Sequence, residues 1–379
     1  MRAIVAMDSF KGSLSASEAC QAVADGLRAA SAAFDVDLMP IADGGEGFLD
    51  VLADATGGER VSGACHDPLG RVMSAPFLRT SDGVAVIEMA AASGLTLLTP
   101  AERDIMRATT YGTGEQLMDA LRGGAKRICL GLGGSATCDG GLGLMRALGM
   151  KFCDGAGREV TTPEELERLE HVDASELDAR LMRCDRQAAC DVDSPLTGPL
   201  GAAHVFGPQK GAGPAEVERL DAALARLSRC MRAAGFDMEG PGAGAAGGLG
   251  GALKALGFEL RPGVDMVLEL THARARIARA ELAIVGEGMT DSQTAAGKAP
   301  CGVARLAAEL GRAAVCISGG LGDDYPALYE HGFTAAFSAV ARPMSVECAI
   351  GNAREYLFNR ARDVGRLWVA ARWLSGYNV

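Results

Sequence analysis

The sequence has no Cys-x-x-Cys pair, no apolar run long enough to span a membrane and no excess of basic residues. Its 11 cysteines are scattered and odd in number, which favours reduced thiols over a disulfide framework or a zinc site. The short apolar start lacks the length of a signal-peptide core, so we expect a cytoplasmic protein without membrane contact. A formal net charge of −11 disfavours nucleic acid as a partner, because basic surface drives that binding.

Two catalytic signatures are also missing. None of the histidines (His66, His171, His204, His272 and His331) stands beside a nucleophile motif, which disfavours a hydrolytic triad. No glycine is followed by four residues and then Gly-Lys-Ser or Gly-Lys-Thr, so the P-loop of many nucleotide-binding enzymes is absent. A phosphate site in this chain therefore needs another construction.

The length of 379 residues exceeds one typical core, so we expect two domains. Apolar runs alternate with helix-compatible segments at both chain ends, which is typical of a doubly wound parallel sheet. Residues 59–87 instead contain short β-like pieces separated by turn residues, which indicates antiparallel strands and a boundary near residues 63–68. The simplest architecture is one α/β domain built from the two ends, with the middle of the chain inserted into it. We expect one long final helix over 346–373.

A glycine-rich stretch, GLGGSATCDGGLG at 131–143, follows a predicted buried strand and precedes a predicted helix. Glycines let the backbone approach a ligand, and free N–H groups at a helix start favour anions. Ser135 and Thr137 add donors, and Asp139 could hold a metal ion or take a proton. The same string also fits a G-x-G-x-x-A dinucleotide fingerprint with Asp154 as its acidic residue, so an NAD-dependent oxidoreductase remains an alternative.

Carboxylates and single lysines recur in the loops that follow other predicted strands. In parallel sheets these loops lie at the carboxyl ends of strands, where α/β proteins bind ligands. Phosphoryl transfer needs this mixture, because N–H groups and lysines stabilise phosphate charge while carboxylates hold Mg²⁺ or accept the proton of the attacking hydroxyl. Hydride transfer would need fewer carboxylates. The residues are Asp8, Lys11, Asp43, Asp139, Asp191, Lys210, Glu287, Asp291 and Lys298.

Nine segments, spread in order over nearly the whole chain, match the pattern of one family. They are DSFKGSLSA (8–16), PIADGGEG (40–47), DPLGR (67–71), IEMAAASGL (87–95), GGSAT with DGG (133–141), CDV to FGPQKGA (190–212), GAGAAGGLG (242–250), GEG to GKAP (286–300) and RPM (342–344). Any single segment is a weak signal, whereas the set is specific. Together they resemble the class I glycerate kinases of bacteria.

The resemblance implies ATP-dependent phosphorylation of D-glycerate with ATP and Mg²⁺ as cofactors. It implies 2-phosphoglycerate as the product, rather than 3-phosphoglycerate. The implied fold is α/β with two domains. A flavodoxin-like or Rossmann-like doubly wound domain would comprise residues 1–66 and 283–379, and a mixed α/β domain would be inserted at 67–282. The active site is expected in the cleft between them.

Four positions depart from the family pattern. Met7 replaces a usual proline, Cys138 and Ser194 replace usual asparagines, and Met289 replaces a usual arginine. Loss of the arginine is expected to weaken binding of phosphate or carboxylate. A catalytically altered paralogue that binds a small hydroxy acid is therefore a second alternative.

Functional roles follow from the chemistry of the matching loops. We predict Lys11, Lys210 and Lys298 as anion clamps. Asp191 is the first candidate for general base or Mg²⁺ ligand and Asp43 the second, with a loop-capping role as the alternative for each. The catalytic set is Asp191, Asp43, Lys11 and Lys210, and the metal candidates are Asp191, Asp43 and Glu287. The predicted substrate- and phosphate-binding set is Asp8, Ser9, Gly133, Gly134, Ser135, Thr137, Asp139, Gln209, Glu287, Asp291, Ser292 and Lys298. The expected partners are glycerate and ATP, and a homodimer is kept open.

Overall fold

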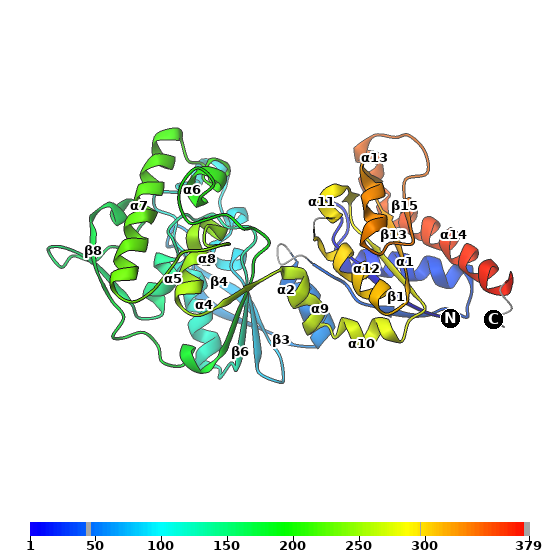
Figure 1. Ribbon diagram of the computed structural model, residues 1–379, viewed down its shortest axis with the longest axis horizontal. Helices are drawn as coiled ribbons and strands as arrows, with labels where there is room; N and C mark the ends of the chain where they lie inside the picture. Colours follow the sequence, from blue (N-terminus) through cyan, green and yellow to red (C-terminus); the bar gives the residue numbers. More distant parts are fainter. Residues whose placement is uncertain (43–46, 296, 375–379) are drawn as a thin grey trace. The chain divides into compact units, whose positions relative to one another are not determined.

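The computed structural model describes residues 1–42, 47–295 and 297–374 (Figure 1). Contacts between residues group the chain into two units, which are treated separately below. The first unit combines residues 1–42, Asp50–Thr56 and the segment from Val264 onward, and the second combines residues 47–49 with Gly57–Gly263. Within the described ranges, no helix has both the length and the apolar character needed to cross a membrane.

The first unit contains a five-stranded sheet in which all strands are parallel. Its strand order is β2-β1-β11-β13-β15, which is the order of flavodoxin-like doubly wound sheets. This arrangement confirms the predicted α/β class. The strands are β1 (Arg2–Met7), β2 (Asp35–Leu38), β11 (Leu282–Gly286), β13 (Ala313–Ser318) and β15 (Ala335–Ser338).

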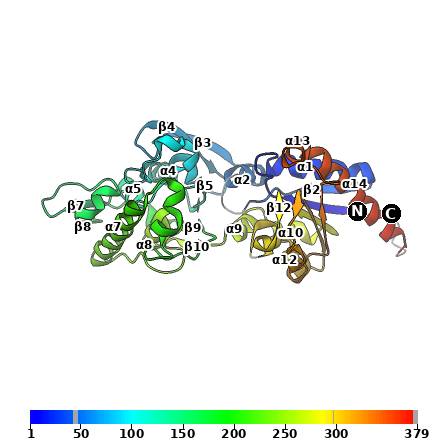
Figure 2. The ribbon, with the colours of Figure 1, turned by 90° about the horizontal axis from the view of Figure 1, so that it is seen from above.

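Helices cover both faces of this sheet. Helices α1 (Ala16–Ala30) and α14 (Ala353–Leu374) pack together on one face, and α12 (Ala299–Glu309) covers the other (Figure 2). Helix α1 begins after Ser15, whose side chain accepts a hydrogen bond from the Glu18 N–H in a capping box. Gly26 permits the close approach of α14, since a Cβ there would lie 2.3 Å from the Phe358 carbonyl oxygen.

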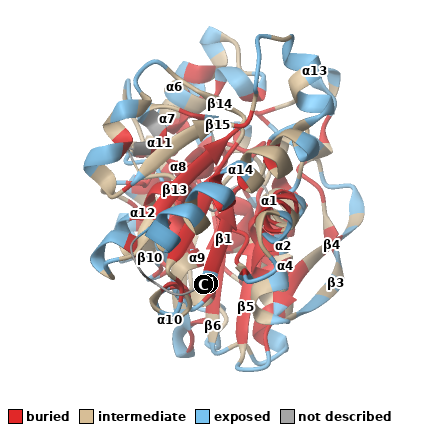
Figure 3. Cartoon of the chain, turned by 90° about the vertical axis from the view of Figure 1, so that its right-hand side faces the viewer, coloured by how far each residue is buried: buried red, intermediate tan, exposed pale blue. Residues whose placement is uncertain are grey.

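The core of the first unit follows the period of the strands. Alternate residues of β1 (Ala3, Val5 and Met7) share one buried cluster with residues of α1 and α14, such as Leu27 and Leu357. Figure 3 shows β1 and β13 as buried strands. The remaining elements are α2 (Phe48–Thr56), α9 (Gly263–Leu270), α10 (Ala273–Ala278), β12 (Met289–Thr290), α11 (Ser292–Ala295), β14 (Gly320–Leu321), a 3₁₀ helix (Tyr325–His331) and α13 (Val346–Gly351).

The prediction of one final helix over 346–373 is wrong. The structure has two helices, α13 and α14, interrupted at Asn352, whose backbone leaves the helical region with φ −118° and ψ 15°. The Asn352 side-chain amide donates to the Cys348 carbonyl at 2.8 Å. That bond satisfies an orphan carbonyl at the end of α13, as capping side chains do. Gly351 and Asn352 are the local signal that the helical periodicity obscured.

The second unit contains a six-stranded mixed sheet in the order β10-β9-β6-β5-β4-β3. Strands β3, β4 and β5 are antiparallel, which confirms the prediction for residues 59–87, and β5, β6, β9 and β10 are parallel. The strands are β3 (Glu59–His66), β4 (Val72–Arg79), β5 (Val84–Glu88), β6 (Arg127–Gly131), β9 (Asp185–Ala189) and β10 (Glu259–Arg261). A separate hairpin joins β7 (Lys151–Asp154) to β8 (Leu169–Asp173).

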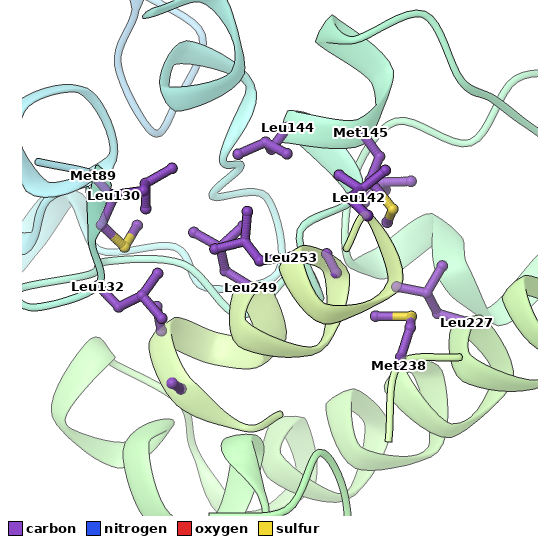
Figure 4. Packing of buried hydrophobic residues seen from close by; sticks show 14 of the residues in the cluster. Met89, Leu130, Leu132, Leu142, Leu144, Met145, Leu227, Met238, Leu249 and Leu253 are labelled. Carbon is purple, nitrogen blue, oxygen red and sulfur yellow. The ribbon is translucent and has the colours of Figure 1, made fainter. Parts of the chain in front are cut away.

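The helices of the second unit enclose one large apolar core. In Figure 4, Leu249 and Leu253 of α8 lie among Leu130, Leu142 and Leu144. Each such fully buried side chain contributes about 1.5–3 kcal/mol to folding. The helices are α3 (Ala90–Ser93), α4 (Tyr111–Arg122), α5 (Leu142–Ala147), α6 (Ala202–Phe206), α7 (Pro214–Ala233) and α8 (Ala245–Ala255). The 3₁₀ helices are Leu95–Leu97, Pro100–Glu102, Glu164–Arg168, Leu181–Arg183 and Pro208–Lys210.

Candidate active site

The glycine-rich loop of the second unit follows β6, at the carboxyl ends of the parallel strands. Gly131, the last residue of β6, pairs with Glu88 of β5 and with Ala189 of β9. The ends of three neighbouring strands therefore meet here, as expected for a ligand site in an α/β sheet. Gly134 is exposed and has a φ of +75°, a conformation that favours glycine.

Two backbone hydrogen bonds fix this loop against residues 93–95. The Ala136 N–H donates to the Ser93 carbonyl at 2.9 Å, and the Leu95 N–H donates to the Gly134 carbonyl at 2.8 Å. Gly133 is half-buried beside the exposed Gly134. The loop thus holds a defined shape with its two glycines toward the surface, as the sequence predicts for an anion cradle.

Lys210 supports the loop from inside the protein. Its ammonium donates to Ser135 Oγ at 2.6 Å and to the Thr137 carbonyl oxygen at 2.8 Å. The side chain is almost completely buried, and this desolvation lowers the pKa of Lys210 to about 8. The structure therefore brings together three predicted residues from sequence positions more than 70 apart.

The hydroxyl group of Thr137 has unused hydrogen-bonding capacity. The residue is fully buried, and within the described chain its Oγ1 atom has no hydrogen-bond partner. An unsatisfied buried hydroxyl costs about 1–3 kcal/mol. Such an atom beside a buried ammonium fits a loop that receives a polar ligand or an ordered water.

Asp139 is fully buried, and its carboxylate accepts hydrogen bonds from other groups of the protein. Oδ2 accepts hydrogen bonds from the Thr110 N–H and hydroxyl, both at 2.8 Å, and from the Gly143 N–H at 3.0 Å. Oδ1 accepts from the Gly141 N–H at 3.0 Å. The carboxylate also suits the start of α5, where backbone N–H groups carry positive partial charge. We therefore assign Asp139 to holding the loop rather than contacting a ligand.

Asp139→Asn is expected to destabilise the protein by about 2 kcal/mol, because an amide NH₂ would then face backbone donors in the interior. Asp154→Asn is the matched control. Asp154 is also buried and accepts from the N–H groups of Ala156 and Arg158, but it lies in the β7–β8 hairpin and not in the glycine-rich loop. Both variants should lower the urea midpoint, and only Asp139→Asn should weaken ligand binding. Equal ligand affinity in the two variants would contradict the assignment.

A left-handed turn in α8 braces the loop from another side. Ala246, Gly247 and Gly248 all have positive φ values, of 51°, 70° and 91°. The Gly140 N–H donates to the Gly247 carbonyl at 3.0 Å. A Cβ at Gly247 would lie 1.9 Å from the Thr137 carbonyl oxygen. The glycine-rich segment thus provides close packing, and the positive φ of Ala246 marks backbone strain beside the candidate site.

Cys138 belongs to the core. It is 1% exposed, and burial raises the pKa of its thiol to about 12. The thiol therefore stays protonated at neutral pH and is neither a nucleophile nor a metal ligand there. Met7, another departure from the family pattern, is buried in the core of the first unit, whereas Met289 is 56% exposed.

Asp191 follows β9, next to the strand that carries the loop. Its side chain is exposed, and Oδ1 accepts a hydrogen bond from the Gly263 N–H at 2.9 Å. This contact orients the carboxylate and leaves it accessible to solvent. Gln209 is exposed, and its carbonyl oxygen accepts from Arg103 at 3.4 Å.

The predicted residues of the first unit gather where β1 and β11 end. Asp8 follows β1, and its N–H donates to the Gly286 carbonyl at 2.9 Å. Asp8 Oδ1 accepts from the Ser9 N–H at 2.6 Å. In this strand order β1 and β11 form the topological switch point, the usual ligand position in flavodoxin-like sheets. Lys11 is exposed in the same loop.

Glu287, which follows β11, lies in a buried polar network. Its Oε1 accepts from the hydroxyls of Thr294 at 2.6 Å and Thr290 at 3.3 Å, and its Oε2 forms an ion pair with Lys298 Nζ at 3.2 Å. The Glu287 N–H donates to Ser318 Oγ at 3.2 Å. The network ties the loops after β11 and β13 together, so Glu287 has a structural partner for each oxygen.

The remaining predictions in the first unit concern Asp291 and Ser292. The Asp291 N–H donates to Thr294 Oγ1 at 3.3 Å. Ser292 is exposed, and its hydroxyl lowers the pKa of Asp324 through a hydrogen bond. Asp43 lies outside the described residues. Across the described ranges, no group of three or more His, Cys, Asp or Glu side chains is arranged to hold a metal ion.

Sequence reasoning missed Glu88 as a candidate. It ends β5 beside Gly131, and its Oε1 accepts from the Leu49 N–H at 3.0 Å. The signal was present, because a carboxylate that directly follows the buried run 84–87 belongs to the same pattern as Asp8 and Asp191.

These features define an α/β protein whose strand ends carry a glycine-rich loop, lysines and carboxylates. The chain belongs to the glycerate kinase family, whose sequence model matches residues 3–369. By this membership it is a kinase, which replaces the NAD-dependent alternative. In agreement, Asp154 is engaged by its own hairpin and by Arg168 at 3.1 Å.

Similar proteins match nearly the whole length of the chain. Glycerate kinase from Bacillus subtilis (strain 168) is 43% identical, with 96% of this chain and 97% of that protein covered. Glycerate 2-kinase from Escherichia coli (strain K12) is 41% identical, with the same coverage of both chains. A crystal structure from Salmonella typhimurium LT2, provisionally named glycerate kinase 2, has a TM-score of 0.89 at 42% identity and covers 98% of this chain and 99% of its own.

Proposed function

We propose that this protein phosphorylates the 2-hydroxyl of D-glycerate with ATP, giving 2-phosphoglycerate. The observation that carries the proposal is the loop at 133–137, in which the exposed Gly134 and the half-buried Gly133 precede Ser135, the residue held by the buried ammonium of Lys210. Glycerate and ATP are both anions, and such a loop stabilises negative charge. The similarity to a protein named glycerate 2-kinase supports the choice of hydroxyl.

The residues present fit ATP and Mg²⁺. Backbone N–H groups at 133–135, the Ser135 hydroxyl and the exposed Lys11 would hold phosphate or carboxylate oxygens. Mg²⁺ is usually held by one or two carboxylates together with phosphates, so the absence of a three-residue cluster in the described chain is compatible with it. When bound, Mg²⁺ would neutralise phosphate charge during transfer.

Asp191 is the carboxylate best suited to work on the substrate. Glu287 is 7% exposed and bonded to Thr294 and Lys298, whereas Asp191 is exposed at a strand end. We assign Asp191 to accepting the proton of the attacking hydroxyl, with Mg²⁺ binding as its second candidate role. Asp43 keeps its place as the second candidate. The Glu287–Lys298 pair would position the loops at the switch point.

An assay of ADP release is expected to show Mg²⁺-dependent turnover with D-glycerate. Coupling through enolase alone distinguishes the products, because 2-phosphoglycerate is consumed directly and 3-phosphoglycerate requires a mutase. ATP–Mg²⁺ should raise the melting temperature and NAD should not. No turnover with D-glycerate, tartronate or related hydroxy acids, despite binding of one of them, would favour the altered paralogue. Cytoplasmic location and a homodimer stay predictions.

A further inference from the structure

The protonated Lys210 side chain can only donate hydrogen bonds, and this fixes the direction of its hydrogen bond with the Ser135 hydroxyl. A lysine ammonium carries three N–H donors and no acceptor. The 2.6 Å contact therefore makes Ser135 Oγ the acceptor, and the second contact, at 2.8 Å, makes the Thr137 carbonyl an acceptor too. The Ser135 hydroxyl proton must point away from Lys210.

We propose that Lys210 is a positioning residue that fixes the Ser135 hydroxyl as a hydrogen-bond donor to an oxyanion of the substrate. Ser135 lies directly after the exposed Gly134 and keeps 8% of its surface accessible. In the described part of the chain, its hydroxyl donates to no protein acceptor. A pre-oriented donor at the loop surface binds an anion without the entropic cost of ordering that hydroxyl.

Among the described residues, no carboxylate forms an ion pair with Lys210. The titratable groups that act on it are Cys138 and Asp139. Cys138 is a protonated thiol at neutral pH, and the Asp139 carboxylate is bonded to the Thr110 and Gly143 donors described above. An anion at the loop would supply the missing negative charge, so anion binding and protonation of Lys210 are linked.

Deprotonation would allow the Ser135 hydrogen bond to reverse, because the neutral amine keeps only two N–H donors and gains an acceptor. A neutral amine has a lone pair and can accept a hydrogen bond. The Ser135 hydroxyl could then donate inward to Lys210, which would leave only the lone pairs of Ser135 Oγ to face the anion and so disfavour anion binding. Affinity for the anion should therefore fall as pH rises through the Lys210 pKa of about 8.

The ligand chemistry is a single oxyanion, either the carboxylate of a hydroxy acid or a phosphate of the nucleotide. This assignment rests on the proposed function. Calorimetric titration of the whole protein with D-glycerate and, separately, with ATP–Mg²⁺ distinguishes the two. Both ligands keep their full charge above about pH 7.5, so a pH dependence there belongs to the protein. One ligand should lose affinity about tenfold per pH unit above pH 8, and the other should change little.

Two substitutions separate positioning from direct contact. Ser135→Ala should lower the affinity for the pH-sensitive ligand roughly tenfold at neutral pH. Over the next two pH units, the loss of affinity should shrink from about 100-fold in the wild type to below about tenfold in the variant. Lys210→Arg should remove the alkaline loss, because arginine stays charged. Ser228→Ala, which deletes another buried serine hydroxyl in the same unit, is the matched control and should keep the wild-type profile.

Three outcomes would overturn the inference. They are an undiminished alkaline loss in Ser135→Ala, no alkaline loss for either ligand in the wild type, or no binding of either ligand at any pH. If Lys210→Arg does not fold, the wild type and Ser135→Ala still decide. pH-dependent binding without turnover of D-glycerate would contradict the proposed function and leave this inference intact. Turnover without pH-dependent binding would contradict the inference alone.

Discussion

Asp191→Asn is expected to lower kcat about 10²- to 10⁴-fold, with a small change in KM for glycerate. The amide cannot accept a proton from the attacking hydroxyl. Its oxygen can still accept the bond from the Gly263 N–H, now 2.9 Å from Asp191 Oδ1, so the local fold should persist. Steady-state kinetics with saturating ATP measure both constants, and an unchanged melting temperature confirms the fold.

Asp193→Asn is the matched control for this prediction. Asp193 is exposed in the same segment, two residues after Asp191, and should tolerate the change with nearly wild-type kcat. A titration with Mg²⁺ separates the two candidate roles of Asp191. Recovery of the Asn variant at high Mg²⁺ would assign Asp191 to the metal instead. Intact turnover with weakened substrate binding would contradict both roles.

Gly247→Ala is expected to destabilise the protein by about 4 kcal/mol and to abolish ligand binding at the loop. The new Cβ would lie 1.9 Å from the Thr137 carbonyl oxygen, which is backbone and already accepts from Lys210. Overpacking of this kind costs about 1–3 kcal/mol, and the positive φ of 70° adds about 1–2 kcal/mol. Urea unfolding measures the loss.

Gly157→Ala isolates the backbone contribution to that loss. Gly157 has a similar φ of 78°, and nothing lies within 4 Å of a Cβ placed there. It should lose only about 1–2 kcal/mol and retain activity. Equal losses in the two variants would show that the contact with Thr137 does not matter. A stable Gly247→Ala protein with normal kinetics would remove the left-handed turn from the description of the site.

The assignment of Asp139 shows where sequence reasoning reached its limit. The sequence places Asp139 in a glycine-rich loop before a helix, which fits a ligand contact and a structural cap equally well. Thr110, which supplies two of its hydrogen bonds, stands 29 residues earlier in the chain. A carboxylate that accepts all of its hydrogen bonds from the protein can have the same neighbouring sequence as a carboxylate that faces a ligand.

The sequence alone determined the elements whose signals are local. Helix α7 runs from Pro214 to Ala233, and a proline at its start and an amphipathic period mark it in the sequence. Strand β13 occupies residues 313–318, which stand out in the sequence as a short apolar run. The glycines and hydroxyls at 131–143, placed after a strand, also predict a ligand site from local composition, although they fit both an anion cradle and a dinucleotide fingerprint.

Only the tertiary structure decided which polar residues work together. It turned Lys210 inward to Ser135, paired Glu287 with Lys298, left Asp191 exposed, and braced the loop with a left-handed turn at Ala246. These outcomes depend on burial and on partners distant in sequence, which set hydrogen bonding and pKa together. Composition and periodicity carry no information about either, because they describe neighbours along the chain and not neighbours in space.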